Sequence, residues 1–141
     1  MLVVVDACIA AKWFFIEEYS ETALHLLYNP FELHAPDLLY IEMDSILGKR
    51  FRRNELTKGE AFDIHDEIYS MSIQTYSTLD LEERAFEIAL ETGASIYDCI
   101  YLSLAELLEC RMITADHKLF RALNNGPLCG FPLWINDLET L

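Results

Sequence analysis

The sequence predicts a three-layer α/β/α domain with a central parallel sheet, and three observations lead to that prediction. Short apolar runs that contain β-branched residues, such as Leu2–Val5, recur along the chain. Segments with apolar residues at helical spacing lie between these runs, as in Ile9, Trp13 and Ile16. Parallel strands need a crossover connection, usually a helix, so the alternation favours helices on both faces of one sheet.

Length and composition predict a single domain over residues 1–141. A chain of 141 residues with 52% hydrophobic content can bury one sizeable core and is too short to hold two comfortably. The sequence contains no internal repeat, no low-complexity tract and no linker rich in Pro, Gly or Ser.

The first half of the chain is expected to hold three strands separated by helices. Thr57 and Glu60 form the capping-box pattern of a helix start, and Asp37 precedes a long apolar-periodic segment as a helix cap would. The expected elements are, in order, a strand at Leu2–Val5, a helix after Asp6, a helical segment at Thr22–Leu27, a strand at Glu32–Ala35, a helix from Asp37 to about Arg53, a helix opened by Thr57, and a strand at Ser72–Tyr76.

The second half continues the alternation. Gly93 is a natural end for a helix, and Ser95 is a suitable residue to open the next one. The expected elements are a helix at Asp80–Thr92, a helix from Ser95 through Leu108, a strand at Arg111–Thr114, a helix at Asp116–Asn124 that closes at Gly126, and a last strand at Leu133–Ile135.

Two acidic residues lie at predicted strand ends. Asp6 ends the first strand, and Asp116 comes two residues after the strand Arg111–Thr114. Ligands of open α/β sheets bind beyond the carboxyl ends of the strands, where the strand order reverses. Either residue alone could be an ordinary helix cap, which stays the alternative for Asp116.

Two further acids lie on predicted helices. Glu42 falls within the apolar stripe of its helix, where a lone carboxylate is costly without a partner or a metal. Asp98 closes the segment Ser95–Asp98, which fits the S-x-x-D form of a capping box, and it could equally face the end of the sheet.

If these four acids converge, their mutual repulsion at neutral pH favours a bound cation. The ligands would be hard oxygens, and no Cys or His stands at ligand spacing, so Mg²⁺ or Mn²⁺ is favoured over zinc. Such a site suits phosphoryl chemistry, because the ion activates water and stabilises the leaving oxygen. Residue spacing alone leaves convergence open.

The formal net charge of −14 argues against broad, non-specific nucleic-acid binding, which depends on Lys and Arg. Any RNA contact must therefore be local. Half of the ten basic residues lie between Lys49 and Lys58, and the candidate RNA-binding residues are Lys49, Arg50, Arg52 and Arg53. The alternative is that these cations only interact favourably with the carboxyl end of a helix.

The chain is expected in the cytoplasm, without membrane association. No stretch approaches the roughly 18 apolar residues of a membrane span, and Met1–Val5 lacks the features of a signal peptide. The four cysteines include no CxxC pair, so neither a zinc site nor a disulfide framework is favoured.

The segments around the four acids, in order and at similar spacing, resemble the PIN-domain family, particularly the VapC-type toxin nucleases of prokaryotic toxin–antitoxin pairs. The similarity runs nearly end to end. The segments that carry it are Val3–Phe14, Pro36–Glu42, Ser95–Glu106 and Met112–Asp116.

The resemblance implies that the first and fourth strands lie side by side, which would bring Asp6 and Asp116 together. It also implies Mg²⁺- or Mn²⁺-dependent hydrolysis of single-stranded RNA, homodimerisation, and inhibition by a small antitoxin. Asp6, Asp98 and Asp116 would be metal ligands. Glu42 would bind the metal or tune a water at it, and Thr114 would orient a ligand or water.

Three features depart from the family pattern: Cys8 replaces the usual Ser or Asn, Ser45 stands where Asn often follows the second acid, and the chain is acidic. The acidic balance would suit a basic antitoxin segment. The helices at Asp37–Arg53 and Glu60–Ile73 are candidates for dimer or antitoxin contacts.

Two other functions stay open. In an α/β phosphatase Asp6 would be the nucleophile, although the position of the usual second Asp holds Cys8. In a non-catalytic binding module the acids would serve packing or partner recognition.

Overall fold

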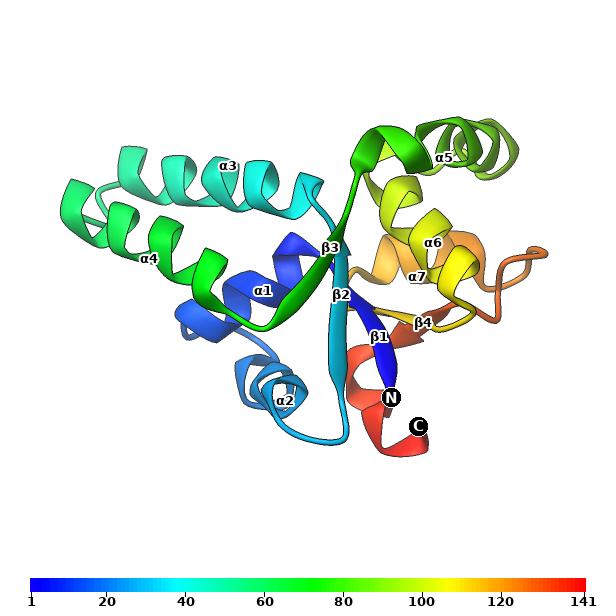
Figure 1. The fold of residues 1–141 in the computed structure, drawn as a ribbon, viewed down its shortest axis with the longest axis horizontal. Coiled ribbons are helices and arrows are strands. Elements are labelled where there is room, and N and C mark those ends of the chain that lie inside the picture. The colour runs from blue at the N-terminus through cyan, green and yellow to red at the C-terminus, as the bar shows by residue number, and fades with distance from the viewer.

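A five-stranded parallel sheet forms the centre of the protein in a computed structural model that describes residues 1–141 (Figure 1). The strand order is β3-β2-β1-β4-β5, and every neighbouring pair is parallel. The strands are β1 (Leu2–Val5), β2 (Glu32–Pro36), β3 (Ile73–Tyr76), β4 (Arg111–Thr114) and β5 (Pro132–Trp134). The predicted central parallel sheet is confirmed.

Helices cover both faces of this sheet, as predicted. The α-helices are α1 (Ala7–Phe14), α2 (Ser20–Leu24), α3 (Leu38–Arg52), α4 (Lys58–Ser70), α5 (Thr78–Thr92), α6 (Ile96–Leu108) and α7 (His117–Leu123). Two short 3₁₀ helices are η1 (His25–Leu27) and η2 (Ile135–Thr140). No helix has the length and apolar content needed to cross a membrane.

The alternation of side chains along β1 assigns the helices to their faces. Val4 packs with the buried residues of α5, α6 and α7, whereas Val3 and Val5 pack with α1, α2 and η2. A third apolar cluster joins α1, β2, α3 and α4 through residues such as Ala35 and Met43. The α3–α4 hairpin therefore projects from one side of the molecule while its base is fixed to the sheet (Figure 1).

The switch point of the sheet lies between β1 and β4. These two strands pair directly, with Val4 opposite Met112, while β2 lies on the far side of β1 and β5 on the far side of β4. The connections that leave β1 and β4 therefore diverge, which opens a crevice at their carboxyl ends. The strand neighbours that the family resemblance implied are present.

Several local sequence signals are confirmed. Thr57 and Glu60 make a complete capping box at the start of α4. Gly93 ends α5 in the left-handed region with φ of 75°, a conformation that glycine adopts without a steric penalty. Ser95 caps α6, and its hydroxyl accepts a hydrogen bond from the backbone N–H of Asp98.

Asp37 occupies the N-cap position of α3, as predicted, but it does not cap this helix with its side chain. The carboxylate instead accepts hydrogen bonds from the backbone N–H of Thr78, at 3.0 Å, and from the Thr78 hydroxyl, at 2.6 Å. Helix α5 accordingly begins at Thr78 and not at the predicted Asp80, because a residue distant in sequence supplies its first acceptor.

The helical segment predicted at Thr22–Leu27 is divided between α2 and η1, and the helix predicted at Glu60–Ile73 is α4, which ends at Ser70. The other differences are shifts of one or two residues at element ends.

Candidate active site

Asp6 occupies the crevice at the switch point. It follows β1 directly and caps α1, because its Oδ1 accepts a hydrogen bond of 2.9 Å from the backbone N–H of Ile9. The residue is only 7% exposed. Its other carboxylate oxygen has no hydrogen-bond donor within the protein, so one oxygen is fixed and the other is available.

Three other elements bring carboxylates toward Asp6. Glu42 comes from the first turns of α3, Asp98 from the first turn of α6, and Asp116 from the start of α7. Burial is the largest cause that raises the pKa of Asp6 from 3.8 to about 7, and the negative charges of Asp98, Glu42 and Asp116 contribute in that order. The structure thus groups the four acids that the sequence singled out, and we name them the carboxylate cluster.

Glu42 and Asp98 share the electrostatics of Asp6. Burial is the main cause that raises the pKa of each, and Asp98 adds its charge to Glu42 as Asp116 does to Asp98. The Asp98 carboxylate accepts a hydrogen bond of 3.0 Å from the Ser95 hydroxyl. It does not reach the Ser95 backbone N–H, so only half of the predicted capping box forms at this helix.

Asp116 can act both as a helix cap and as a site residue, the two roles considered from the sequence. Its Oδ1 caps α7 by accepting a hydrogen bond of 3.1 Å from the backbone N–H of Leu119, while the residue stays exposed at the crevice. Thr114 is fully buried, and its hydroxyl accepts a hydrogen bond of 3.0 Å from the backbone N–H of Asp116. Thr114 therefore orients the backbone that carries Asp116.

Tyr101 also borders the cluster and was not predicted from the sequence. Its buried hydroxyl has no hydrogen-bond partner in the structure. Burial, followed by the nearby Glu42 carboxylate, raises the pKa of Tyr101, so this hydroxyl faces Glu42. Its position three residues after Asp98 was the available signal, because that spacing places both on one side of α6.

Cys8 lies at the rim of the cluster. The charge of Asp6 is the main cause that raises the pKa of Cys8 to about 12, with burial second. Sulfur is a soft ligand, whereas Mg²⁺ and Mn²⁺ prefer oxygen, so Cys8 does not add to the ligand set of the cluster.

The carboxylate oxygens of the cluster are ligands that a hard divalent cation prefers. The side chains would have to move closer together to bind one ion. No three His, Cys, Asp or Glu side chains lie close enough to hold one ion as they stand. The negative charges still act on one another beyond ligand distances and add to the effect of burial on the pKa values of Asp6, Glu42 and Asp98. Asp6, Asp98 and Asp116 each have one oxygen free of protein hydrogen bonds, and the unpartnered Tyr101 hydroxyl lies beside them.

The basic residues expected to contact RNA lie away from this cluster. They lie at the carboxyl end of α3, at the end of the projecting hairpin (Figure 1) and roughly 10 to 16 Å along the helix axis from Glu42. Arg50 is engaged by Glu17 at 2.7 Å and Glu55 at 3.4 Å, and its guanidinium lies over the ring of Phe15. Lys49, Arg52 and Arg53 are exposed there. The structure does not join these four residues to the carboxylates.

The fold and the site together define a class: α/β proteins with a parallel sheet and a group of acidic side chains at its switch point. A site of this kind can bind a cation. Within that class, the sequence model of one family, described as PIN domain, matches residues 3–125. Ribonuclease VapC3 of Pyrobaculum aerophilum is 33% identical over 121 residues, which cover 84% of this chain and 92% of that protein. This chain therefore belongs to the PIN domain family and, within it, to the VapC ribonucleases.

Solved structures show the same fold at lower sequence identity. The crystal structure of PAE2754 from Pyrobaculum aerophilum has a TM-score of 0.69 at 21% identity, covering 99% of this chain and 96% of that one. A toxin–antitoxin complex from Klebsiella pneumoniae contains a chain with a TM-score of 0.64 at 16% identity, covering 93% of this chain and 95% of that one.

Proposed function

We propose that this protein is an endoribonuclease that hydrolyses single-stranded RNA with Mg²⁺ or Mn²⁺ and acts as the toxin of a toxin–antitoxin pair. The observation that carries the proposal is the buried Asp6 carboxylate, with three other acids around it at the switch point of the sheet. Membership of the VapC ribonucleases supports RNA as the substrate.

In this proposal Asp6, Asp98 and Asp116 hold the ion, and Glu42 completes the set. A bound Mg²⁺ or Mn²⁺ would lower the pKa of an attacking water and stabilise the charge on the leaving oxygen. The cation would also relieve the repulsion that raises the pKa values of the carboxylates.

Three side chains near the proposed ion would have the other roles in the reaction. Glu42 is half-buried with a raised pKa, and such a carboxylate is suited to accept a proton from the attacking water. The Tyr101 hydroxyl would donate a hydrogen bond to Glu42 and fix its orientation. Thr114 would keep Asp116 in place through the backbone hydrogen bond described above.

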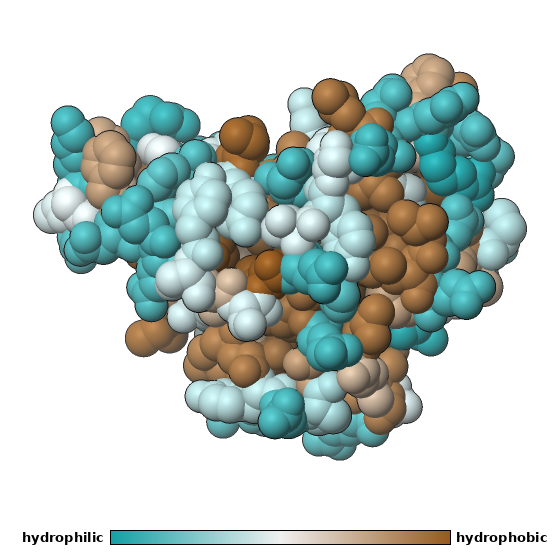
Figure 2. Space-filling model, in the orientation of Figure 1, coloured by the Kyte–Doolittle hydropathy of each residue, from teal (hydrophilic) through white to brown (hydrophobic).

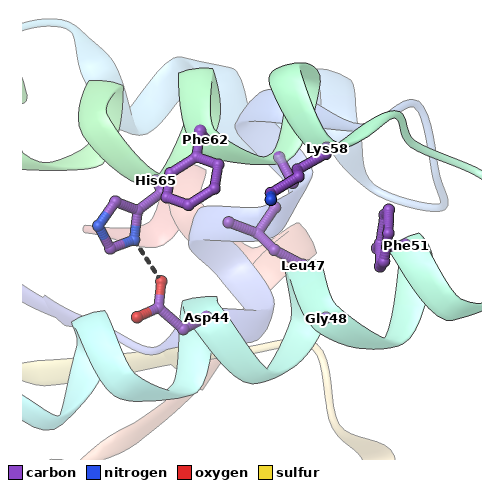
Figure 3. Close-up of a pocket in the computed structure, with 8 residues that line it drawn as sticks. Asp44, Leu47, Gly48, Phe51, Lys58, Phe62 and His65 are labelled. Atoms are coloured by element: carbon purple, nitrogen blue, oxygen red, sulfur yellow. Dashed lines mark hydrogen bonds and ion pairs between the residues drawn. The ribbon is translucent and has the colours of Figure 1, made fainter.

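We further propose a small antitoxin and a second copy of the chain as partners. A groove of about 490 Å³ between α3 and α4 is lined by apolar side chains, including Leu47, Phe51 and Phe62, and suits an apolar antitoxin segment (Figure 3). Apolar patches over α5 and α6 interrupt the hydrophilic surface (Figure 2), and the exposed Leu79 and Phe86 on α5 favour self-association.

We also propose that residues 1–141 form one nuclease domain that works in the cytoplasm. The pairing of β5 with β4 supports a single domain, because it ties the segment beyond residue 125 into the same sheet.

The first prediction is that purified protein cleaves a fluorescent single-stranded RNA with Mn²⁺ or Mg²⁺ and not in excess EDTA. Asp6→Asn and Asp116→Asn should each reduce the rate on the order of a hundredfold or more, because each removes a negative ligand. Both keep an oxygen that can cap the following helix, so circular dichroism should show intact folds.

Asp137→Asn is the matched control, because it makes the same change at an exposed position outside the cluster. Cleavage that persists in excess EDTA would contradict the metal-dependent mechanism. Absence of cleavage with any divalent cation would favour the non-catalytic binding module.

A further inference from the structure

A cleft of about 650 Å³ opens beside the carboxylate cluster, and we name it the α1–α7 cleft. Asp116 and Cys8 line the end that adjoins the cluster. The cleft also holds three of the ten basic residues of a protein whose net charge is −14, namely Lys12, Lys118 and Arg121. Cations are thus concentrated next to the acids, where a nucleic-acid backbone would have to pass.

Two of these cations are free to bind an anion. Lys118 and Arg121 are three residues apart on α7, so they lie on the same side of this helix, and both are exposed. Neither is among the residues that form ion pairs with carboxylates. The Arg121 Nε donates a hydrogen bond of 3.3 Å to the carbonyl of His117, which holds the side chain along the helix.

The negative charge of Glu17, which also lines the cleft, is compensated by two cations. Glu17 accepts a hydrogen bond of 3.1 Å from Lys12 and one of 2.7 Å from Arg50. These two cations neutralise Glu17 and keep it in place, so the charge presented to the cleft away from Asp116 is that of Lys118 and Arg121.

An aromatic surface adjoins the same cleft. The His117 ring stacks on Trp134, with centroids 4.0 Å apart and an interplanar angle of 25°. Tyr19 contacts Trp134 edge-on at 5.6 Å, and Phe120 lies against it at 6.0 Å, so the stack rests on packed aromatic rings. His117 itself is exposed and lines the cleft. Unpaired bases stack on such rings with little dependence on sequence.

We propose that the α1–α7 cleft binds the nucleotide adjacent to the scissile phosphate of single-stranded RNA. Lys118 and Arg121 contact its phosphates, and its base stacks on His117. This inference rests on the proposed function and replaces Lys49, Arg50, Arg52 and Arg53 as the principal RNA contacts.

The test measures binding of a short fluorescent single-stranded RNA by anisotropy in EDTA, from about 50 to about 200 mM salt. The double variant Lys118→Gln/Arg121→Gln should lower the slope of log affinity against log salt by about 1.4, because each phosphate contact on single strands contributes about 0.7. His117→Ala should weaken binding about fivefold or more and leave the slope unchanged, because stacking releases no counterions.

The matched control is Arg52→Gln/Arg53→Gln, which removes the same charge from the end of α3 and should leave the slope unchanged. A slope that falls in this control and not in the cleft variant would overturn the proposal. Failure of the wild type to bind RNA would overturn it as well.

A parallel cleavage assay in Mn²⁺ separates this inference from the proposed function. If the wild type cleaves RNA and the two double variants have equal slopes, the proposal for the cleft is wrong and the proposed function is unaffected. A slope that depends on Lys118 and Arg121 without any cleavage would support these two residues as RNA contacts and overturn the proposed function.

Discussion

At the scale of single residues, Asp6 is subject to opposing effects. Burial and three neighbouring carboxylates raise its pKa, while the hydrogen bond from the Ile9 backbone lowers it, and the net result is a pKa of about 7. An acid of this kind is partly protonated at neutral pH, so its charge becomes favourable only when a cation approaches. Asp6 therefore couples folding stability to pH and to metal.

The second prediction is that Asp6→Asn stabilises the protein at pH 8 in EDTA. The folded-state pKa of Asp6 lies above the unfolded value of 3.8, so its contribution to stability is complete below pH 4 and is lost as the pH rises through 7. The asparagine side chain carries no charge and can still accept the hydrogen bond from Ile9. The variant should gain roughly 1 to 4 kcal/mol at pH 8 relative to wild type.

Urea unfolding at pH 4, 6 and 8 measures this difference, which should shrink as the pH falls. Asp137→Asn, exposed and outside the cluster, should show no such trend. An Asp6→Asn variant with the stability and the pH dependence of wild type would mean that Asp6 is mainly a helix cap, because Asn keeps the hydrogen bond from Ile9. A variant less stable than wild type at pH 8 would contradict the raised pKa of Asp6.

The sequence identified some of the site residues and not others, for a physical reason. Asp6 and Asp116 follow apolar strands, and this pattern is visible along the chain. The stack of His117 on Trp134 depends on contacts between distant segments, which spacing within one segment does not encode. For Tyr101 the spacing from Asp98 was visible, but the lack of a partner for its buried hydroxyl was not.

At the scale of elements, one hydrogen-bond network links the start of α3 to the start of α5. Asp37 accepts hydrogen bonds from Thr78, and the Thr78 hydroxyl accepts one of 2.9 Å from the backbone N–H of Leu38. Each residue therefore satisfies a helix terminus in another element. Since α3 carries Glu42, the network also helps to set the position of that carboxylate.

The third prediction is that Asp37→Ala and Thr78→Ala each cost about 1 to 2 kcal/mol of stability, because each leaves helix-terminal N–H groups without an acceptor. The double variant should cost clearly less than the sum, since the same interaction is lost in both. Urea unfolding of the four proteins completes the cycle. Additive losses would show that the two side chains act independently.

This network explains why the helix starts could be predicted only in part. The capping box at Thr57 and the glycine at Gly93 use acceptors and donors of neighbouring residues, and both were predicted. Asp37 resembles a local cap in sequence, but its donors lie about forty residues away, beyond what local patterns describe.

At the scale of the whole molecule, the strand order groups acidic residues that come from separate segments. The order β3-β2-β1-β4-β5 places the ends of β1 and β4 together, and three helices then add their acids to Asp6. Sequence alternation predicted the parallel sheet, whereas the strand order came from the family resemblance. Convergence of the acids could not follow from spacing, because it depends on that order.

The distribution of charge is the second property of the whole molecule. A net charge of −14 disfavours RNA over most of the surface, while Lys118 and Arg121 offer cations next to the cluster. The acidic surface would thereby confine RNA to the site, and it would attract a basic segment of an antitoxin elsewhere.

The central claim, that the four acids form one cation site, is tested most directly by Mn²⁺-dependent thermal unfolding of wild type and Asp98→Asn at neutral pH. The asparagine introduced by this substitution would still accept the hydrogen bond from Ser95, so the variant removes charge and retains the local contact. In EDTA it should be as stable as wild type or more so. At 100 times the dissociation constant of Mn²⁺, wild type should gain about 2.7 kcal/mol and Asp98→Asn much less. Equal gains in the two proteins, or no gain in wild type at millimolar Mn²⁺, would contradict the claim.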